Sequence, residues 1–113
     1  MKEFAYFDEL PVAVTVCDNE GIILYMNRKS SATFSNDGGS DLVGKSVLDC
    51  HPEPARGKLQ ALLDSHNSNS YTIEKEGKKK MIHQTPWFEG GEFKGLVEFS
   101  FEIPTELPNF KRG

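Results

Sequence analysis

Alternating apolar and polar positions near the start of the chain predict a β-hairpin. Over residues 12–17, valines alternate with smaller or polar side chains, which is the period of two expected of a strand. Residues 18–21, Asp-Asn-Glu-Gly, favour a turn, because Asp and Asn side chains bond their own backbone and glycine tolerates positive φ. The aliphatic and aromatic run 22–26 then provides the second strand.

The pattern then changes to a helical period. Asn27 can cap a short helix over residues 28–34, and the polar and glycine-rich run 35–40 indicates a loop. A longer helix can start at Pro52 or Pro54, since proline is favoured in a first turn. Its apolar or neutral face follows a spacing of i, i+4, i+7, i+8 and i+11: Ala55, Leu59, Leu62, Leu63 and His66. After a polar break, three further strands are expected at 71–74, 81–88 and 93–103.

Composition narrows the class of protein. A chain of 113 residues has room for one core and one domain. No apolar run approaches the roughly 20 residues of a membrane helix, and acidic residues interrupt the N-terminal apolar stretch, so we expect a cytoplasmic protein without a membrane segment. The net charge is −4 and the only basic run, residues 78–80, falls at a predicted hairpin tip. Nucleic-acid binding is therefore not expected.

Three stretches resemble one known family. Residues 10–27 read L-P-x-x-V-x-V-x-D-x-x-G-x-I-x-Y-x-N, which resembles the opening of a PAS domain. Residues 42–49, L-x-G-K-x-V-x-D, resemble its central segment, and residues 91–99, G-E-F-x-G-x-V-E-F, resemble its final strands. The Cys-His-Pro at residues 50–52 is similar to that of a bacterial PAS subset.

The resemblance implies an α+β fold. We expect a PAS-like, five-stranded antiparallel sheet with short helices and one longer helix packed on one face. Residues 1–9 would form an N-terminal cap, residues 10–103 the PAS-like domain and residues 104–113 a C-terminal tail. Pro104 would block a continuous helix after the last strand. The resemblance further implies a sensory or interaction module of signal transduction, acting through a homodimer or a separate signalling protein.

A small-molecule ligand would lie between sheet and helices. The positions predicted to point inward are the candidate pocket residues: Val16, Tyr25, Leu48, His51, Leu62, His83 and Phe99. Heme-binding PAS domains ligate iron with a histidine on or near the long helix, so His51 or His66 is a candidate axial ligand, with Cys50 beside them. In Cys50-His51-Pro52 the cysteine is not directly followed by proline, which weakens a thiolate ligand. A single histidine at a plausible position is weak evidence for a cofactor. The favoured interpretation is that His51 caps the helix and that His66 is a polar residue at its end.

Other chemistry has less support. The flavin-binding N-C-R-F-L-Q motif is missing, and the three histidines and two cysteines show no metal-ligand spacing, so neither a flavin nor a metal site is expected. Cys50 and His51 are neighbours that point in different directions on a helix or a strand, so no enzyme activity is expected. Three alternatives stay open: a heme-based gas or redox sensor, a small enzyme with Cys50 as nucleophile, and a structural dimerisation domain without ligand.

Overall fold

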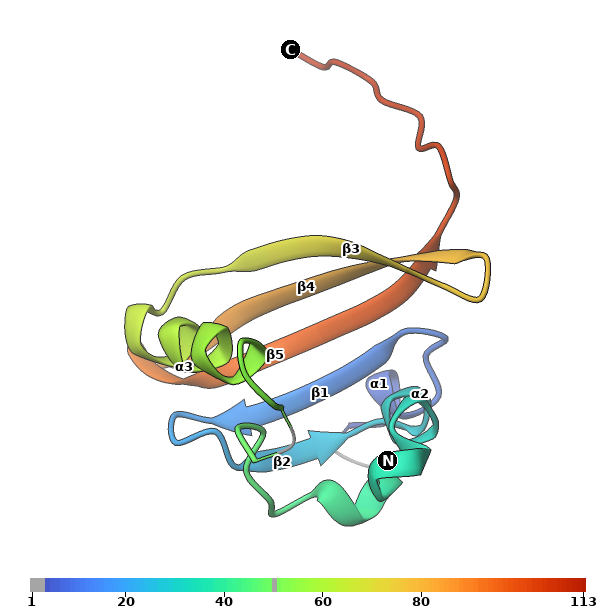
Figure 1. Ribbon diagram of the computed structural model, residues 1–113. Helices are drawn as coiled ribbons and strands as arrows, with labels where there is room; N and C mark the ends of the chain where they lie inside the picture. The colour runs from blue at the N-terminus through green and yellow to red at the C-terminus, as the bar shows by residue number, and fades with distance from the viewer. Residues whose placement is uncertain (1–3, 50) are drawn as a thin grey trace.

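The computed structural model describes residues 4–49 and 51–113 and contains one five-stranded antiparallel sheet (Figure 1). The strands lie in the order β2-β1-β5-β4-β3. Their bounds are Ala13–Asp18 for β1, Ile23–Met26 for β2, Asn69–Lys75 for β3, Lys78–Glu89 for β4 and Glu92–Ile103 for β5. The predicted α+β architecture, with one longer helix, is confirmed.

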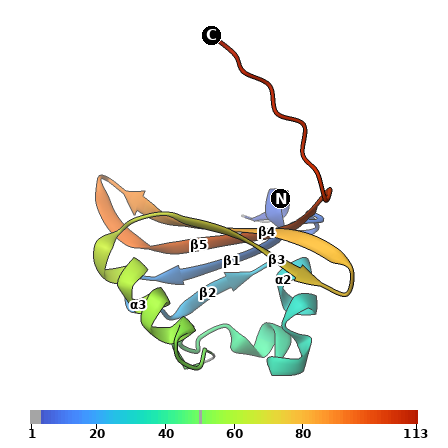
Figure 2. The ribbon, with the colours of Figure 1, turned by 45° about the horizontal axis from the view of Figure 1, so that its top comes forward.

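Helices α2 (Arg28–Thr33) and α3 (Ala55–Ser65) lie on one face of the sheet, which we call the inner face (Figure 2). The short helix α1 (Ala5–Asp8) lies against the other, outer face. Residues 35–40, expected to be a loop, instead contribute to two 3-10 turns, Ser35–Asp37 and Gly39–Leu42. After β5 the chain runs away from the sheet (Figure 1).

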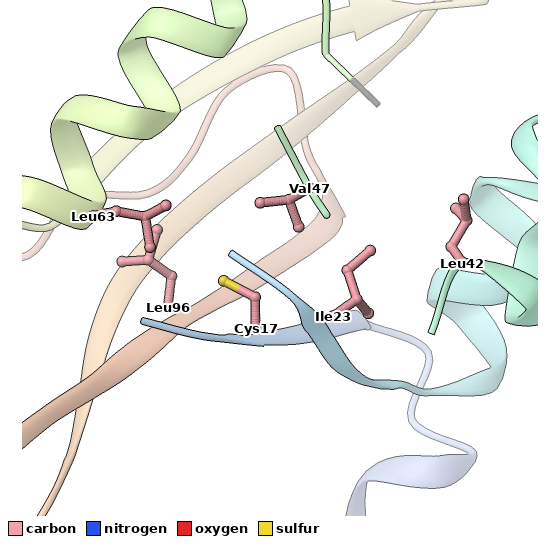
Figure 3. Close-up of a cluster of buried hydrophobic side chains, with 6 residues drawn as sticks. All are labelled: Cys17, Ile23, Leu42, Val47, Leu63 and Leu96. Carbon is pink, nitrogen blue, oxygen red and sulfur yellow. The ribbon is translucent and has the colours of Figure 1, made fainter. Parts of the chain in front are cut away.

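The core lies between the inner face and α3. Cys17, Ile23 and Leu96 rise from β1, β2 and β5, while Val47 and Leu63 approach from the covering segments (Figure 3). These five side chains are at most 9% exposed, and Leu42 completes the cluster. Burial of this apolar surface is the main force that holds α3 on the sheet.

Turn residues set where the strands begin. The turn between β3 and β4 contains only Glu76 and Gly77, both at positive φ. Lys78 pairs with Lys75, so the basic run 78–80 begins strand β4 instead of forming the hairpin tip that the sequence predicted. Two-residue hairpin turns with positive φ at both positions match the right-handed twist of the strands, which explains the tight connection.

A glycine brings two strands unusually close. A Cβ atom at Gly95, whose φ is +153°, would lie 1.9 Å from the carbonyl oxygen of Cys17 on the neighbouring strand β1. Trp87, the register partner of Gly95 on β4, donates its indole N–H to the same oxygen at 3.0 Å. Gly95 therefore lets three strands meet at one point, which a larger residue would prevent.

Candidate functional site

A small cavity lies between the inner face and the covering helices. Its volume is about 60 Å³, and apolar side chains of the core cluster form most of its wall. Cys17, Ile23 and Leu96 on the sheet and Val47 opposite them mark its position in Figure 3. Residues with polar atoms also line it: Thr15, Cys17, His51, Gln84 and Glu98.

Two facing polar residues distinguish the sheet wall of this cavity. Gln84 of β4 and Glu98 of β5 are direct register partners, so both side chains point to the inner face. Gln84 is 8% exposed; its Nε2 donates to Glu98 Oε2 at 2.9 Å, and its Oε1 accepts from Asn69 Nδ2 at 3.0 Å. Burial of the amide is tolerated because both its oxygen and its nitrogen have partners.

Two further sheet residues with polar atoms, Thr15 and Cys17, line the cavity. Thr15 shares a hydrogen bond with Ser30 of α2. Burial raises the pKa of the Cys17 thiol, a hydrogen bond with the Leu96 backbone opposes this, and the negative charges of Asp18 and Glu98 raise the pKa further. Cys17 is therefore held as a neutral thiol, which is a poor nucleophile.

His51 lines the cavity from the segment before α3. Its Nδ1 lies 2.6 Å from the carbonyl oxygen of Val47, and a carbonyl can only accept, so Nδ1 carries the proton. In the neutral imidazole, Nε2 is then left with its lone pair. This tautomer is the one that metal-binding histidines use when the second nitrogen is held by a carbonyl.

The space around His51 does not fit a heme. A cavity of about 60 Å³ is smaller than the ~150 Å³ void that accepts benzene, and a porphyrin is much larger than benzene. His51 therefore has the tautomer of a metal ligand, but the cavity beside it is too small for the porphyrin of a heme. Within residues 4–49 and 51–113, no group of three or more His, Cys, Asp or Glu side chains is placed to hold a metal ion.

Four of the predicted pocket residues lie on the opposite face of the sheet. Val16, Tyr25 and Phe99 line a hollow on the outer face, and His83 pairs with Phe99 in the register and so shares that face. His83 Nδ1 lies 2.6 Å from the hydroxyl of Ser70. The sequence-based choice selected one consistent face, but the structure turns that face outward. A shift of one residue in parity is enough to exchange the two faces.

The other candidates lie near the core. Leu48 and Leu62 pack against the core cluster without lining the cavity, whereas His51 does line it. His66 is exposed, ends α3 in the left-handed conformation at φ 61°, and stacks on Phe93 with ring centroids 3.7 Å apart. The ring stacking offsets part of the cost of that backbone conformation. Cys50 lies outside the described residues.

The outer face carries a larger apolar hollow. Its volume is about 370 Å³, and α1, β1, β2, β4 and β5 all contribute to it. The wall is formed by aromatic and aliphatic residues: Phe4, Phe7, Val14, Val16, Leu24, Tyr25, Trp87, Val97 and Phe99. Leu24 is 49% exposed and Phe4 is 45% exposed, so part of this apolar surface meets solvent. Contiguous exposed apolar surface of this kind commonly marks an interaction site.

Polar contacts hold α1 against this outer face. The Tyr25 hydroxyl donates to Asp8 Oδ1 at 2.6 Å, and the ring of Phe4 lies 4.8 Å from that of Tyr25. Asn27, 1% exposed, donates from Nδ2 to the carbonyl oxygens of Phe7 and Val12. Its Oδ1 accepts from the backbone N–H of Val14 and of Ser30, and the latter bond caps α2. One side chain thus joins α1, β1 and α2.

Gln84 and Glu98 were missed by the sequence-based choice. The signal that could have found them is their shared parity with buried Ile82 and Leu96, two residues away on the same strands. Val97 and Phe99, which alternate with Leu96 and Glu98 along β5, are more apolar as a pair and therefore determined the sequence-based choice. Parity alone cannot decide between two faces when both are partly covered.

Comparisons with known proteins agree with this fold. A family model described as PAS fold matches residues 7–69. The PAS domain of BvgS from Bordetella pertussis is similar at a TM-score of 0.66 and 22% identity, over 88% of this chain and 82% of that chain. The Aer2 receptor from Vibrio cholerae, a dual PAS-heme oxygen sensor, is similar at a TM-score of 0.60 and 19% identity, over 82% of this chain and 95% of that chain.

VqmA is similar in two structures, both at a TM-score of 0.68 and 14% identity over 91% of this chain. One is bound to DPO and is covered over 57% of its chain; the other, a Vibrio cholerae dimer, is covered over 52%. At these identities the likeness concerns the fold alone. A search of curated proteins found no match. None of the described helices has the length and apolar character needed to cross a membrane.

Proposed function

Since the chain belongs to the PAS fold family, we propose that it is a sensory module of signal transduction that binds a small molecule in its inner cavity. PAS domains of the family act as sensory modules. The observation that carries the proposal is the cavity itself: an apolar pocket with a few oriented polar groups, His51, Gln84 and Glu98. We assign the sensory domain to residues 10–103, the cap to residues 1–9 and the tail to residues 104–113.

Ligand binding would act on the packing between α3 and the sheet. Leu59 of α3 lines the cavity, so an occupant that enlarges the space must shift the helix or the segment before it. A ligand shifts the equilibrium only by its difference in affinity for the two arrangements. The volume of about 60 Å³ makes any ligand larger than a few atoms dependent on such a shift.

A screen of small fragments by ¹⁵N–¹H correlation NMR tests this proposal. We expect some fragments to shift the amide signals of Thr15 and Cys17 in the cavity wall. Leu59→Phe, which fills the cavity from α3, should abolish these shifts. Leu62→Phe is the matched control, because it is half-buried on the same helix but does not line the cavity. Binding that survives Leu59→Phe, or a screen with no shifts in these residues, would reject the proposal.

We further propose that the outer face meets a second copy of this chain. The exposed apolar surface around Leu24 and Phe4 supports an interface, and VqmA, of the same fold, is a dimer in one structure. Sedimentation equilibrium should show a dimer that Leu24→Glu converts to a monomer. Leu107→Glu, on the exposed tail, should leave the dimer intact. A monomeric wild-type chain would reject the homodimer and leave a separate signalling protein as the partner.

A heme-binding sensor is not part of this proposal, because the cavity is too small for a porphyrin. An absorption spectrum after addition of hemin, with His51→Ala beside the wild type, checks this conclusion. We expect no stoichiometric Soret band in either protein. A band that His51→Ala alters would mean that the cavity opens far beyond the conformation described above.

A further inference from the structure

Glu98 is a half-buried carboxylate, and its two oxygens differ in their hydrogen bonds. Its Oε2 accepts from Gln84, whose amide is oriented by Asn69 on the next strand. Because a carboxylate only accepts hydrogen bonds, the contact fixes which end of the Gln84 amide faces it. In the described part of the chain, nothing donates a hydrogen bond to Oε1.

No cation balances this carboxylate within the described residues. Glu98 takes part in none of the ion pairs found there, and neither lysine nor arginine lines the cavity. Its negative charge adds to the effect of burial in raising the pKa of Cys17 and of Tyr71. A carboxylate drawn out of water without a counter-charge is unfavourable, and a cation placed beside it offsets that cost.

The opposite wall of the cavity also presents an acceptor. The Nδ1 proton of His51 is donated to the Val47 carbonyl, so the neutral form of the ring has only the Nε2 lone pair left as an acceptor. Glu98 on the sheet and His51 opposite it thus both favour a ligand that donates hydrogen bonds. An anionic ligand would meet the negative charge of Glu98, and neither lysine nor arginine lines the cavity to offset the repulsion.

The size of the cavity sets a further limit. One water molecule needs roughly 10–15 Å³ of such volume, so about 60 Å³ accepts a ligand with only a few non-hydrogen atoms. Most of the rest of the wall is apolar, formed by residues such as Met26, Phe34 and Leu42, and suits a short hydrocarbon chain.

From these observations we propose that the cavity selects a small alkyl amine in its ammonium form, with the charged nitrogen at Glu98 Oε1. The inference rests on the proposed function, since it names the class of ligand for that cavity. His51 Nε2 offers a second acceptor to the ammonium group or to another donor of the ligand. The alkyl part lies against the apolar wall formed by Met26, Phe34 and Leu42.

Three probes of matched size test the proposal: propylammonium, 1-propanol and propanoate, titrated at constant ionic strength and followed by amide shifts of Thr15 and Cys17. We expect propylammonium to bind roughly tenfold or more tightly than propanoate, as for hydrogen bonds to charged groups. Glu98→Gln keeps an acceptor for Gln84, so the variant should fold; it should weaken propylammonium roughly tenfold and leave 1-propanol unchanged. Glu102→Gln, on the same strand and face but outside the cavity, is the matched control.

The outcomes separate this inference from the proposed function. If the three probes bind equally, or if Glu98→Gln leaves propylammonium binding unchanged while Leu59→Phe abolishes it, the cavity binds ligands but does not select a cation. If no probe binds while the fragment screen finds other ligands sensitive to Leu59→Phe, the inference again fails alone. If neither the probes nor the screen gives shifts sensitive to Leu59→Phe, the inference and the proposed function both fail.

Discussion

The two faces of the sheet differ in what their side chains can do. The inner face places a carboxylate and a buried amide, Glu98 and Gln84, beside a cavity of about 60 Å³. The outer face has a hollow of about 370 Å³ whose wall is almost entirely aromatic or aliphatic. Oriented polar groups can discriminate between ligands, whereas apolar surface mainly adds affinity for whatever covers it. Under the two proposals above, the inner face would select the ligand and the outer face would provide the surface for association.

Cys17 connects the two faces. Its thiol lines the inner cavity, while its carbonyl oxygen accepts from the indole of Trp87, which lines the outer hollow. A displacement of β1 at Cys17 would move both the thiol in the inner cavity and the hydrogen-bond partner of Trp87 at the outer hollow. If both proposals hold, the adjacent strands β1, β5 and β4 would connect the ligand cavity with the interface.

Gly95→Ala should disrupt the packing on both faces of the sheet. The added methyl group would collide with the Cys17 carbonyl oxygen, and the backbone at φ +153° would be strained as well. We expect a loss of more than about 4 kcal/mol in the free energy of unfolding. Urea titration monitored by the fluorescence of Trp87 measures this loss.

Gly57→Ala is the control for this substitution. Gly57 lies in α3, where a Cβ atom would meet only the carboxylate end of the Glu53 side chain, 3.2 Å away. A change of less than about 1 kcal/mol is expected, because alanine favours a helix more than glycine does. Similar effects at the two positions would show that the close approach of β1 and β5 is not what Gly95 permits.

Asn27→Ala should separate α1 from the outer face and uncap α2. The substitution leaves the backbone groups of Val12, Val14 and Ser30 without their Asn27 partner, whereas the Phe7 carbonyl still accepts from the N–H of Leu10. We expect a loss of about 3–4 kcal/mol, since each buried unsatisfied group costs about 1–3 kcal/mol and water can reach some of them. Asn36→Ala, at an exposed position, should change the midpoint of urea unfolding by a negligible amount. Equal losses in the two variants would contradict the joining role of Asn27.

Leucine truncation compares the two faces directly. Leu63→Ala removes a 4% exposed side chain from the inner core and should cost about 2–3 kcal/mol. Leu24→Ala on the outer face, 49% exposed, should cost less than about 1 kcal/mol in the monomer. Thermal unfolding at low protein concentration measures both. If Leu24→Ala is the more destabilising variant there, the outer face is part of the folding core and is not a surface for association.

The sequence predicted the sheet and the longer helix because their periodic patterns are local properties of the chain. It did not predict which face of the sheet is inward. Val97 and Phe99 are more apolar than Leu96 and Glu98 taken together, so parity pointed to the outer face, which is apolar because α1 covers part of it. His66 was expected to continue the helical face, but the left-handed end of α3 places it on Phe93 instead. The Gln84–Glu98 contact depends on the register between β4 and β5, which no single strand contains.

Tyr25→Phe should give the smallest effect and tests how firmly α1 holds the outer face. Loss of the hydrogen bond to Asp8 is expected to cost about 1 kcal/mol at pH 7. Burial raises the pKa of Tyr25 to about 12, and the hydrogen bond and negative charge of Asp8 contribute to the rise. Because the unfolded chain releases this proton near the ordinary value of 10, the stabilisation is complete below pH 10 and is lost as the pH rises towards 12.

The difference in unfolding free energy between wild type and Tyr25→Phe should therefore shrink between pH 10 and pH 12, as measured by urea titration at several pH values. Tyr6→Phe is the control, since Tyr6 lies on α1, the helix that carries Asp8, and is 74% exposed. A constant difference across this range would mean that the phenol of Tyr25 is not held in its neutral form by Asp8. The contacts of Asn27 would then be the main polar attachment of α1 to the outer face, and Tyr25 would contribute through its ring alone.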